Sequence, residues 1–434
     1  MTDVQPLGSI LTVTKGKRPK RLSDTPKPGY VPYLDIAAIE QGNKRQWADP
    51  NEAHLVPAGQ LVMVWDGARS GWSALAPFAG ALGSTLAALD SPLQPSYLRA
   101  VLSYYFGAIN SNHRGSGIPH VNPDFLRALD CPVPSPGQQR ALSQLQIDME
   151  KRERDASGHI TSAVTTVNRF KQAVLAAAWS GRLTADWREA HPTTTAELSP
   201  PLPIQSWGAR HGGVVAEPSL LPDLPESWIP ATLGSLVERI EAGKSFNALG
   251  RPASPAEWGV IKVSAMSWGN FREQENKALQ SHQLPNRRHE VKEGDLLISR
   301  ANTVDLVGAT VLVGKCRPRL LLSDKSLRLV PCSGIAKGWL NYTLRAPASR
   351  LQFADRATGT SDSMRNLSQV KILATTLPLP PLDEQQEIAR RIDMLYQRID
   401  QLEGRVEGAA HRVAATSQAV LAKSLHGELV GEAS

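Results

Sequence analysis

Apolar side chains recur along two long stretches of the chain at alternating spacings of four and three residues, as in the seam of a two-stranded coiled coil. In the second stretch the seam contains Ile388, Ile392, Leu395, Ile399, Leu402, Val406, Ala409, Val413, Thr416 and Val420. In the first stretch it contains Leu142, Gln146, Met149, Glu153, Ala156, Ile160, Ala163, Val167, Phe170 and Val174. The pattern predicts two long helices that pair with each other, the first from Gln138 to Ser180. Each is followed by a glycine, Gly181 or Gly427, which is a common helix stop.

Shorter apolar runs between turn-forming residues precede each long helix, and they are typical of β-strands. Examples are GQLVMVW from Gly59, GDLLISR from Gly294 and ATVLVGK from Ala309. Short helices are expected at 96–106 and 338–344. The segments in front of the long helices are therefore predicted to be mixed α/β domains.

The two halves of the chain repeat each other. QAVLAAAWSGRLT from Gln172 returns 246 positions later as QAVLAKSLHGELV, and PVPSPGQQRAL from Pro132 returns as PLPPLDEQQEI at the same offset. Towards the front the offset falls to 235 between Val56 and Val291 and to 226 between Leu7 and Leu233, so the second front domain has gained about twenty residues. A repeat of this length indicates two domain-sized copies and excludes a solenoid of short repeats.

The repeat predicts an α+β protein with an internal pseudo-twofold duplication, in which a long antiparallel two-helix coiled coil separates two mixed α/β domains. The predicted boundaries are 1–135 for the first domain, 136–183 for its helix, 184–227 for a linker, 228–380 for the second domain, and 381–434 for the second helix and tail. The linker prediction follows from its richness in Pro, Gly, Ser and Thr.

Composition and charge narrow the class of protein. The net charge is +7, and the excess lies mainly in residues 228–378, with 21 Lys and Arg against 12 Asp and Glu. Such a domain suits a polyanion such as duplex DNA, although a solvated basic surface would show the same excess. The three cysteines lack CxxC spacing, the amino terminus lacks a signal-peptide pattern, and no apolar run approaches eighteen residues. We expect a cytoplasmic protein.

The motifs that catalysis would require are missing from this sequence. The string closest to the N/D-P-P-F/Y/W loop of an adenine methyltransferase, from Asn122 to Phe125, has Asp in place of the second proline. There is no GxxxxGK[ST] phosphate loop, and the histidines lack metal-ligand spacing. We expect no catalytic residue, no metal site and no cofactor bound by this chain.

Over essentially its whole length the chain resembles the specificity subunits of Type I restriction-modification enzymes. The stretches that carry the resemblance are LPESWIPATLGSL from Leu224, GDLLISR, ATGTSDSMRNLS from Ala357, PLPPLDEQQEI from Pro378 and the two QAVL helix ends. The first copy departs from the pattern, because it has SPGQQ in place of PLDEQQ and no Trp before Leu7.

The resemblance implies a non-catalytic subunit in which each front domain is a target recognition domain that reads one half of a bipartite, asymmetric site in double-stranded DNA. It implies that the helices set the gap between the half-sites and dock two methyltransferase subunits, to which restriction and translocase subunits add. S-adenosylmethionine, ATP and Mg are then expected on the partner subunits. The alternative is a stand-alone DNA-binding or scaffold protein of the same architecture without methyltransferase partners.

Candidate DNA contacts are cationic and polar residues in loops that contain Gly or Pro, where backbone can approach DNA. In the first domain they are Lys15, Lys17, Arg18, Lys20, Arg21, Arg69, Ser70, His113, Arg114 and Ser116. In the second they are Lys244, Ser245, Arg251, Arg272, Arg287, Arg288, Arg300, Asn302, Arg356, Thr358, Thr360 and Arg365. Arg300 and Asn302 are the preferred candidates for base readout, because Arg and Asn bond bidentately to guanine and adenine edges. Trp65, Trp72, Trp258 and Trp268 are expected in cores.

Overall fold

The structure, a computed structural model, describes residues 3–114, 118–192, 215–280, 285–361 and 364–425. The chain divides into two compact units, Met1–Ser162 with Arg405–Ser434, and Ala163–Gly404. Each unit therefore holds one front domain and part of both long helices. No helix in the described part of the chain is long and apolar enough to cross a membrane.

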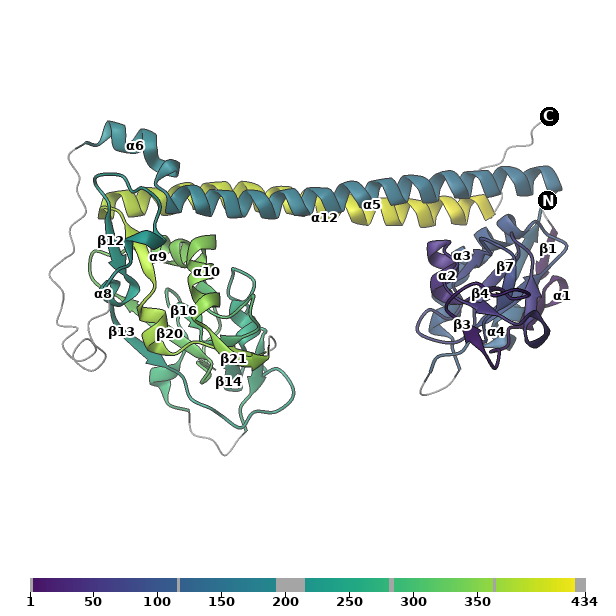
Figure 1. Cartoon of the computed structure of the whole chain (residues 1–434), viewed down its shortest axis with the longest axis horizontal. Coiled ribbons are helices and arrows are strands. Elements are labelled where there is room, and N and C mark those ends of the chain that lie inside the picture. Colours follow the sequence, from purple (N-terminus) through teal and green to yellow (C-terminus); the bar gives the residue numbers. More distant parts are fainter. Residues whose placement is uncertain (1–2, 115–117, 193–214, 281–284, 362–363, 426–434) are drawn as a thin grey trace. The chain divides into compact units, whose positions relative to one another are not determined.

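The front domain of the first unit contains two main sheets and several short helices (Figure 1). Its strands are β1 (Asp3–Pro6), β2 (Thr12–Lys15), β3 (Leu22–Ser23), β4 (Val31–Leu34), β5 (Trp47–Ala48), β6 (His54–Val56), β7 (Leu61–Val64), β8 (Ser73–Leu75), β9 (Gly80–Leu82), β10 (Leu86–Asp90) and β11 (Asp130–Val133). Its helices are α1 (Leu7–Ile10), α2 (Ile36–Gln41), α3 (Pro95–Ser111) and α4 (Pro123–Ala128). The sheet orders are β2-β10-β7-β8 and β3-β5-β4-β9-β6, and β1 pairs with β11.

The front domain of the second unit repeats this plan. Its strands are β12 (Ile229–Thr232), β13 (Val237–Ala242), β14 (Gly259–Ile261), β15 (Asn276–Ala278), β16 (Leu296–Ser299), β17 (Ala301–Asn302), β18 (Thr310–Leu312), β19 (Leu320–Leu321), β20 (Ser326–Pro331), β21 (Thr358–Ser361), β22 (Met364–Asn366) and β23 (Thr376–Leu379). Its helices are α8 (Leu233–Leu236), η5 (Val263–Met266), η6 (Arg287–His289), α9 (Lys337–Arg345), α10 (Pro347–Arg356) and α11 (Gln369–Leu373). The strands predicted around Leu61, Leu296 and Val311 and the helices predicted at 96–106 and 338–344 are confirmed.

The sheet topology confirms the duplication. The order β13-β20-β16-β18 matches β2-β10-β7-β8, the pair β12/β23 matches β1/β11, and the parallel pair β14/β19 matches β4/β9. Gly16 and Gly243 hold the same position, because a Cβ on either would lie 2.2 Å from the carbonyl oxygen of Gly83 or Ser323. Part of the extra length of the second copy lies where two helices, α9 and α10, replace the single helix α3 of the first copy.

The long helices α5 (Pro136–Trp179) and α12 (Leu382–Leu425) confirm the periodicity argument. Within the second unit they lie side by side and antiparallel (Figure 1): Lys171 Nζ is 2.9 Å from Glu403 Oε1, and Tyr396 Oη donates to the carbonyl oxygen of Lys171. Ile388, Ile392 and Ile399 are at most 3% exposed, as a seam requires. Gly181, with φ of 74°, follows the end of α5, whereas Gly427 lies outside the described residues.

Three seam assignments are wrong: Thr416 is exposed, and so are two apolar residues. Leu402 is 48% exposed and Phe170 is 47% exposed. Near Leu402 it is Glu403 that turns towards Lys171 on the opposite helix. A straight helix has 3.6 residues per turn, so a strict 3.5-residue pattern drifts out of the contact by about 20° per heptad. These apolar side chains are therefore available on the helix surface.

A matched glutamine joins each front domain to its own helix. In the first copy Gln139 Oε1 accepts from the backbone N–H of Gln94, 2.9 Å away, and Gln139 Nε2 donates to the carbonyl oxygen of Pro134. In the second copy Gln385 makes the same two bonds, with Ala336 and Pro380. Both side chains are buried, at 6% and 2% exposure. The repeated Gln thus satisfies backbone groups at the start of α3 and of α9.

The residue before each glutamine explains how the copies differ. Glu384 is completely buried; its Oε1 accepts from Thr184 Oγ1 at 2.6 Å and from Arg188, and its Oε2 accepts from Trp228 Nε1 at 2.7 Å. The carboxylate therefore ties the segment after α5, including α6 (Ala185–Ala190), and the start of the second domain to the beginning of α12. Its equivalent, Gln138, is only partly buried, and its side chain bonds to the nearby Ser135. Trp228 and Glu384 bond to each other in the second copy, and the first copy lacks both residues of this contact.

Candidate nucleic-acid interface

Four of the residues proposed for the second domain come together on the small sheet β17-β22-β21 and next to it. Asn302 in β17 pairs with Arg365 in β22, and Thr358 in β21 pairs with Asn366. Arg300 immediately precedes β17, and its backbone bonds to Lys325 and Leu367. Thr360 also lies in β21, but its side chain is outside the described residues. The sheet therefore presents Asn302, Thr358 and Arg365 from neighbouring strands.

The candidate base reader Asn302 is already bonded within the domain. Its Oδ1 accepts from the backbone N–H of Thr303 at 2.9 Å, and its Nδ2 is 3.4 Å from Ser267 Oγ. These contacts fix the rotamer and link β17 to the turn that follows η5. Because the rotamer of the amide is already fixed, little side-chain entropy is lost when the amide binds a base edge.

The turn after η5 carries an exposed aromatic that was expected in the core. Trp268 is 59% exposed, and the guanidinium of Arg272 lies 4.9 Å from its ring centroid. Gly269 follows Trp268 with φ of 84°, a left-handed conformation that favours glycine. The first domain has the same turn, at Gly42 with φ of 69°, but Gln41 occupies the place of Trp268. The only sequence signal for this exposure is the Gly-Asn turn that follows the Trp.

The other candidates of the second domain are scattered over its surface. Lys244, Ser245, Arg287 and Arg288 are exposed. Arg251 is exposed but forms a bidentate ion pair with Glu257, at 2.7 and 2.8 Å. Arg356 is a correction, because its guanidinium is largely covered, donates to Gln352 at 3.1 Å and lies 3.8 Å from Glu217. It therefore acts as an internal contact of α10.

The first domain has a charged cluster at the position of the small sheet. Asp66 forms a β-bridge with His120, and His120 forms one with Arg114. In the second domain Ala301 pairs with Asn366, and Asn366 pairs with Thr358, in the same arrangement. The Asp66 carboxylate accepts from Lys15 at 2.9 Å and from His120 at 2.7 Å. Burial opposes ionisation of Asp66, but these two hydrogen bonds outweigh it and lower the pKa of the carboxyl group. Asp66 and His120 were not among the predicted residues, because only the ladder brings them beside Lys15.

The cationic loop of the first domain is exposed. Among the described residues, Lys17, Arg18, Lys20 and Arg21 form no ion pair, so their charges face solvent. Lys17 and Lys244 are equivalent, since each directly follows one of the matched glycines. Such cations suit phosphate contacts, which position a protein on DNA without reading sequence.

The remaining candidates of the first domain differ in how far their side chains are bonded within the domain. Arg69 pairs with Glu40 and lies 4.5 Å from the Trp72 ring centroid. Exposed Arg114 pairs with Asp124, and exposed His113 Nδ1 is 2.8 Å from the carbonyl oxygen of Asn110. Ser70 is a correction, because it is completely buried and bonded to Asn110, so a ligand cannot reach it. Ser116 lies outside the described residues.

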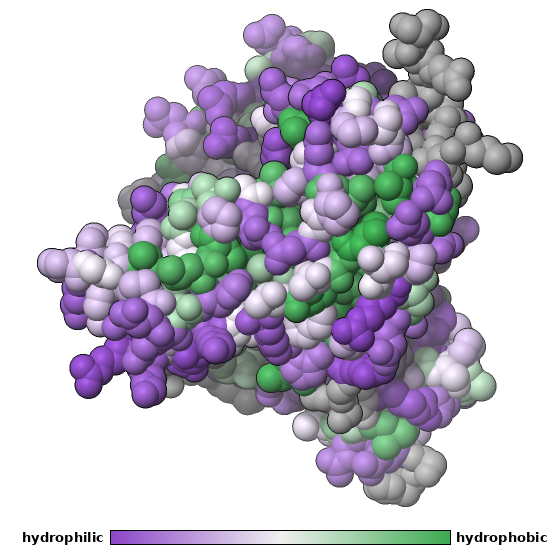
Figure 2. Space-filling view, turned by 90° about the vertical axis from the view of Figure 1, so that its right-hand side faces the viewer, coloured by the Kyte–Doolittle hydropathy of each residue, from purple (hydrophilic) through white to green (hydrophobic). Residues whose placement is uncertain are grey.

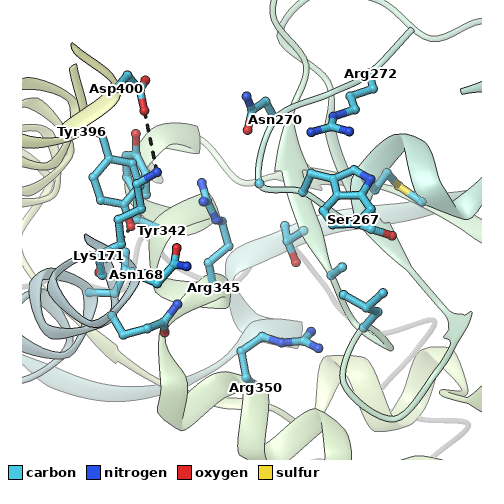
Figure 3. A pocket seen from close by; sticks show the side chains of 18 of the residues that line it. Asn168, Lys171, Ser267, Asn270, Arg272, Tyr342, Arg345, Arg350, Tyr396 and Asp400 are labelled. Atoms are coloured by element: carbon cyan, nitrogen blue, oxygen red, sulfur yellow. Dashed lines mark hydrogen bonds and ion pairs between the residues drawn. The ribbon is translucent and has the colours of Figure 1, made fainter. Parts of the chain in front are cut away.

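A cleft of about 750 Å³ opens in the second unit between the front domain and the helix pair (Figure 3). Its charged lining is balanced: Lys171, Arg272, Arg345 and Arg350 face Asp305, Asp393, Asp400 and Glu403. Several of these charges already have partners. Lys171 lies 3.7 Å from Asp400, Tyr342 donates to Asp393, and Arg345 lies 5.6 and 5.8 Å from the ring centroids of Tyr342 and Tyr396. These contacts connect the front domain to the helices. The charges that line the cleft sum to zero, so the cleft does not favour a polyanion.

The described part of the chain holds no cluster of side chains suited to metal binding. No group of three or more His, Cys, Asp or Glu side chains there could hold a metal ion. The cysteines are free, and burial raises the pKa of Cys131 to about 12, which suppresses its thiolate. Asn122, in the string nearest to a methyltransferase loop, caps α4 and accepts from the backbone N–H groups of Asp124 and Phe125. That string is a helix start.

Sequence comparison finds specificity subunits of Type I restriction enzymes. No protein-family model matches the chain. The EcoEI specificity subunit of Escherichia coli is 32% identical over 178 residues, which are 40% of this chain and 30% of that protein. The EcoKI subunit of Escherichia coli (strain K12) is 23% identical over 76% of this chain and 64% of its own length, and the EcoBI subunit of Escherichia coli is 21% identical over 98% and 86%. The first two matches thus span less than two thirds of those relatives.

Structure comparison extends the likeness over nearly the whole chain. A chain from a study of complex assembly and conformational transition in the type I R-M system covers 98% of both chains at 18% identity, with a TM-score of 0.68. The HsdS subunit from Thermoanaerobacter tengcongensis covers 98% of this chain and 97% of that one at 18% identity, with a TM-score of 0.50. Sequence and fold together identify the chain as a relative of the specificity subunits of Type I restriction enzymes.

Proposed function

We propose that this chain is the DNA-specificity subunit of a Type I restriction-modification complex and that each front domain reads one half of a bipartite, asymmetric site. The observation that carries the proposal is the duplication: two domains of the same topology each join one helix of an antiparallel pair through an equivalent glutamine. The reading surfaces differ, with Asp66 and His120 in one domain and Ala301 and Asn366, beside Asn302 and Arg365, at the equivalent ladder positions in the other. Different side chains on one scaffold suit two different half-site sequences.

The reading surface of the second domain is centred on Asn302. Arg365 in the neighbouring strand, the preceding Arg300 and the Trp268–Arg272 pair supply guanidinium groups for guanine edges and phosphates. Lys17 and Lys244, in equivalent turns of the two domains, contact the phosphate backbone in this proposal. The charge of residues 228–378 provides the attraction that does not depend on sequence.

The helix pair is proposed to set the unread gap and to dock two methyltransferase subunits. Val164, Phe170 and Leu402 are 46 to 48% exposed on the long helices, and apolar side chains in such places suit a partner protein. Apart from these helix residues, Figure 2 shows hydrophobic residues gathered among hydrophilic ones on the face that it presents. Restriction and translocase subunits complete the proposed complex. S-adenosylmethionine, ATP and Mg would be bound by these partners.

Co-purification followed by sequencing of methylated DNA tests the proposal. Tagged chain expressed in its own host should bring down methyltransferase subunits, and transfer of the genes into a host without modification should create one methylated bipartite motif. A chain that purifies without a methyltransferase and leaves host DNA unmodified would support the stand-alone DNA-binding or scaffold alternative.

A further inference from the structure

Each front domain exposes one large apolar side chain at the same structural position. Ile118 is 64% exposed and Met364 is 53% exposed. They are 246 residues apart, as are His120 and Asn366, which the strand ladder shows to be equivalent. Of the large apolar side chains exposed in the described part of the chain, these two alone occupy matching positions.

Both side chains stand beside the proposed reading surface. Met364 begins β22, next to Arg365, which pairs with Asn302. Ile118 precedes Pro119, whose carbonyl oxygen accepts from the backbone N–H of Gly67, 2.8 Å away, and His120 of the Asp66 cluster follows. A single exposed apolar residue is ordinary in any protein. An apolar residue kept at one site in two domains, beside polar groups that differ, indicates that the site itself is used.

The chemistry of the proposed complex supplies a use for it. A methyltransferase that modifies a base must first take the base out of the helical stack, which costs a few kcal/mol. Apolar side chains that enter between base steps stabilise such unstacked DNA. A complex with two methyltransferase subunits opens the stack once in each half-site, and each front domain offers one apolar side chain.

We propose that Ile118 and Met364 are wedge residues: each enters the base stack of its own half-site and stabilises the duplex from which the target base has been withdrawn. This inference rests on the proposed function. It makes the specificity subunit a participant in base extraction, in addition to reading the sequence.

The test uses the full complex with its methyltransferase subunits and duplexes that carry the motif found by sequencing methylated DNA. Met364→Ser should slow methylation in the half-site of the second domain by ~10-fold, and Ile118→Ser should do so only in the other half-site. With 2-aminopurine at the target position, each variant should lose the fluorescence increase of the unstacked base in one half-site. A mismatch opposite the target base, which weakens its pairing, should restore each variant to within about twofold of the wild-type rate.

Control variants separate the wedge from other roles. Met364→Leu should retain the wild-type rate, and Leu351→Ser, which removes a 64% exposed apolar side chain of α10, should leave both half-sites unchanged. Loss of complex assembly in Met364→Ser would overturn the wedge and assign the residue to a methyltransferase contact. Equal slowing in both half-sites, or slowing that a mismatch does not relieve, would also overturn it. A wild-type complex that methylates no DNA would instead refute the proposed function.

Discussion

At the scale of single residues, the buried carboxylate of Glu384 has the largest structural consequence. A charged group without any exposure is tolerated only where charge and hydrogen bonds compensate for lost water, and Arg188, Thr184 and Trp228 provide this. Together with Glu384, these residues come from three separate parts of the sequence. Glu384 thus fixes how the linker end, the second domain and α12 meet.

Glu384→Ala should destabilise the chain strongly, because it removes the carboxylate partner of Arg188 and leaves the indole N–H of Trp228 without its acceptor. Removal of one partner from a buried pair costs about 3 to 5 kcal/mol. Denaturant unfolding followed by tryptophan fluorescence measures the loss. The matched control is Gln138→Ala, at the equivalent position, which is only partly buried and makes no ion pair in the described part of the chain, so a change within about 0.5 kcal/mol is expected. Similar losses in the two variants would contradict the assigned role of Glu384.

Base readout by Asn302 can be separated from its structural role. Asn302→Asp keeps the oxygen that accepts from the N–H of Thr303 but cannot donate to adenine. Asn302→Asp and Arg300→Ala should each relax one position of one half-site, at about 1 to 3 kcal/mol per lost bidentate contact, while thermal stability stays near wild type in Asn302→Asp. Sequencing of methylated motifs reads the outcome. Relaxation of both half-sites by one substitution would argue against independent readers.

Side-chain chemistry in the sequence predicts which residues could bind DNA better than it predicts where they lie. Lys17 and Arg18 are exposed, as expected for a loop rich in cations. Ser70 and Arg356 are candidates by the same reasoning, yet Ser70 is buried against Asn110, and Arg356 is largely covered and lies 3.8 Å from Glu217. Trp268 was assigned to the core because most tryptophans are buried, but a left-handed glycine turn exposes it. Long-range packing decides these cases, and local sequence carries little of that information.

At the scale of elements, periodicity is the more reliable guide. The long helices could be predicted within two residues at the described ends of α5, because an apolar seam repeated over many turns is typical of paired long helices. The sequence shows the duplication, but the partner of each strand required the structure. In particular, the small sheet β17-β22-β21 joins segments about sixty residues apart in sequence.

The antiparallel pairing decides where the proposed spacer can be lengthened. Equivalent positions in the two copies, such as Ala156 and Leu402, do not face each other, because Lys171 contacts Glu403 and Tyr396. Four residues should therefore be inserted in α5 near Asn168 and four in α12 near Leu402. The pair then lengthens by about 6 Å, at about 1.5 Å per residue, and the apolar seam is roughly kept because four residues make little more than one turn.

Such a variant should read unchanged half-sites across a gap one or two base pairs longer, since a base pair rises about 3.4 Å. Sequencing of methylated DNA from cells that carry the variant and its partners measures the gap. A single insertion in α5 alone is the control, and it should reduce activity because it shifts the seam out of register. An active double variant with an unchanged gap would mean that the helices do not set the spacing.

At the scale of the whole molecule, recognition and chemistry are expected to reside on different chains. The sequence lacks the methyltransferase loop and the phosphate loop, and the nearest string to the former is the capped start of α4. In the proposed complex, the shared plan of the two halves would let two copies of one partner bind in equivalent ways. A pseudo-twofold subunit is suited to recruit a pair of identical enzymes to an asymmetric site.

The purified chain should therefore bind duplex DNA in a salt-dependent manner but should neither transfer methyl groups from S-adenosylmethionine nor hydrolyse ATP. Addition of the methyltransferase subunits should yield methylation of both half-sites, with two methyltransferase subunits per specificity subunit by native mass spectrometry. A catalytically dead methyltransferase subunit is the control, because it should assemble in the same ratio without activity. Methyl transfer by the chain alone, after removal of every partner, would show that the chemistry resides here and would require a site that the sequence motifs do not reveal.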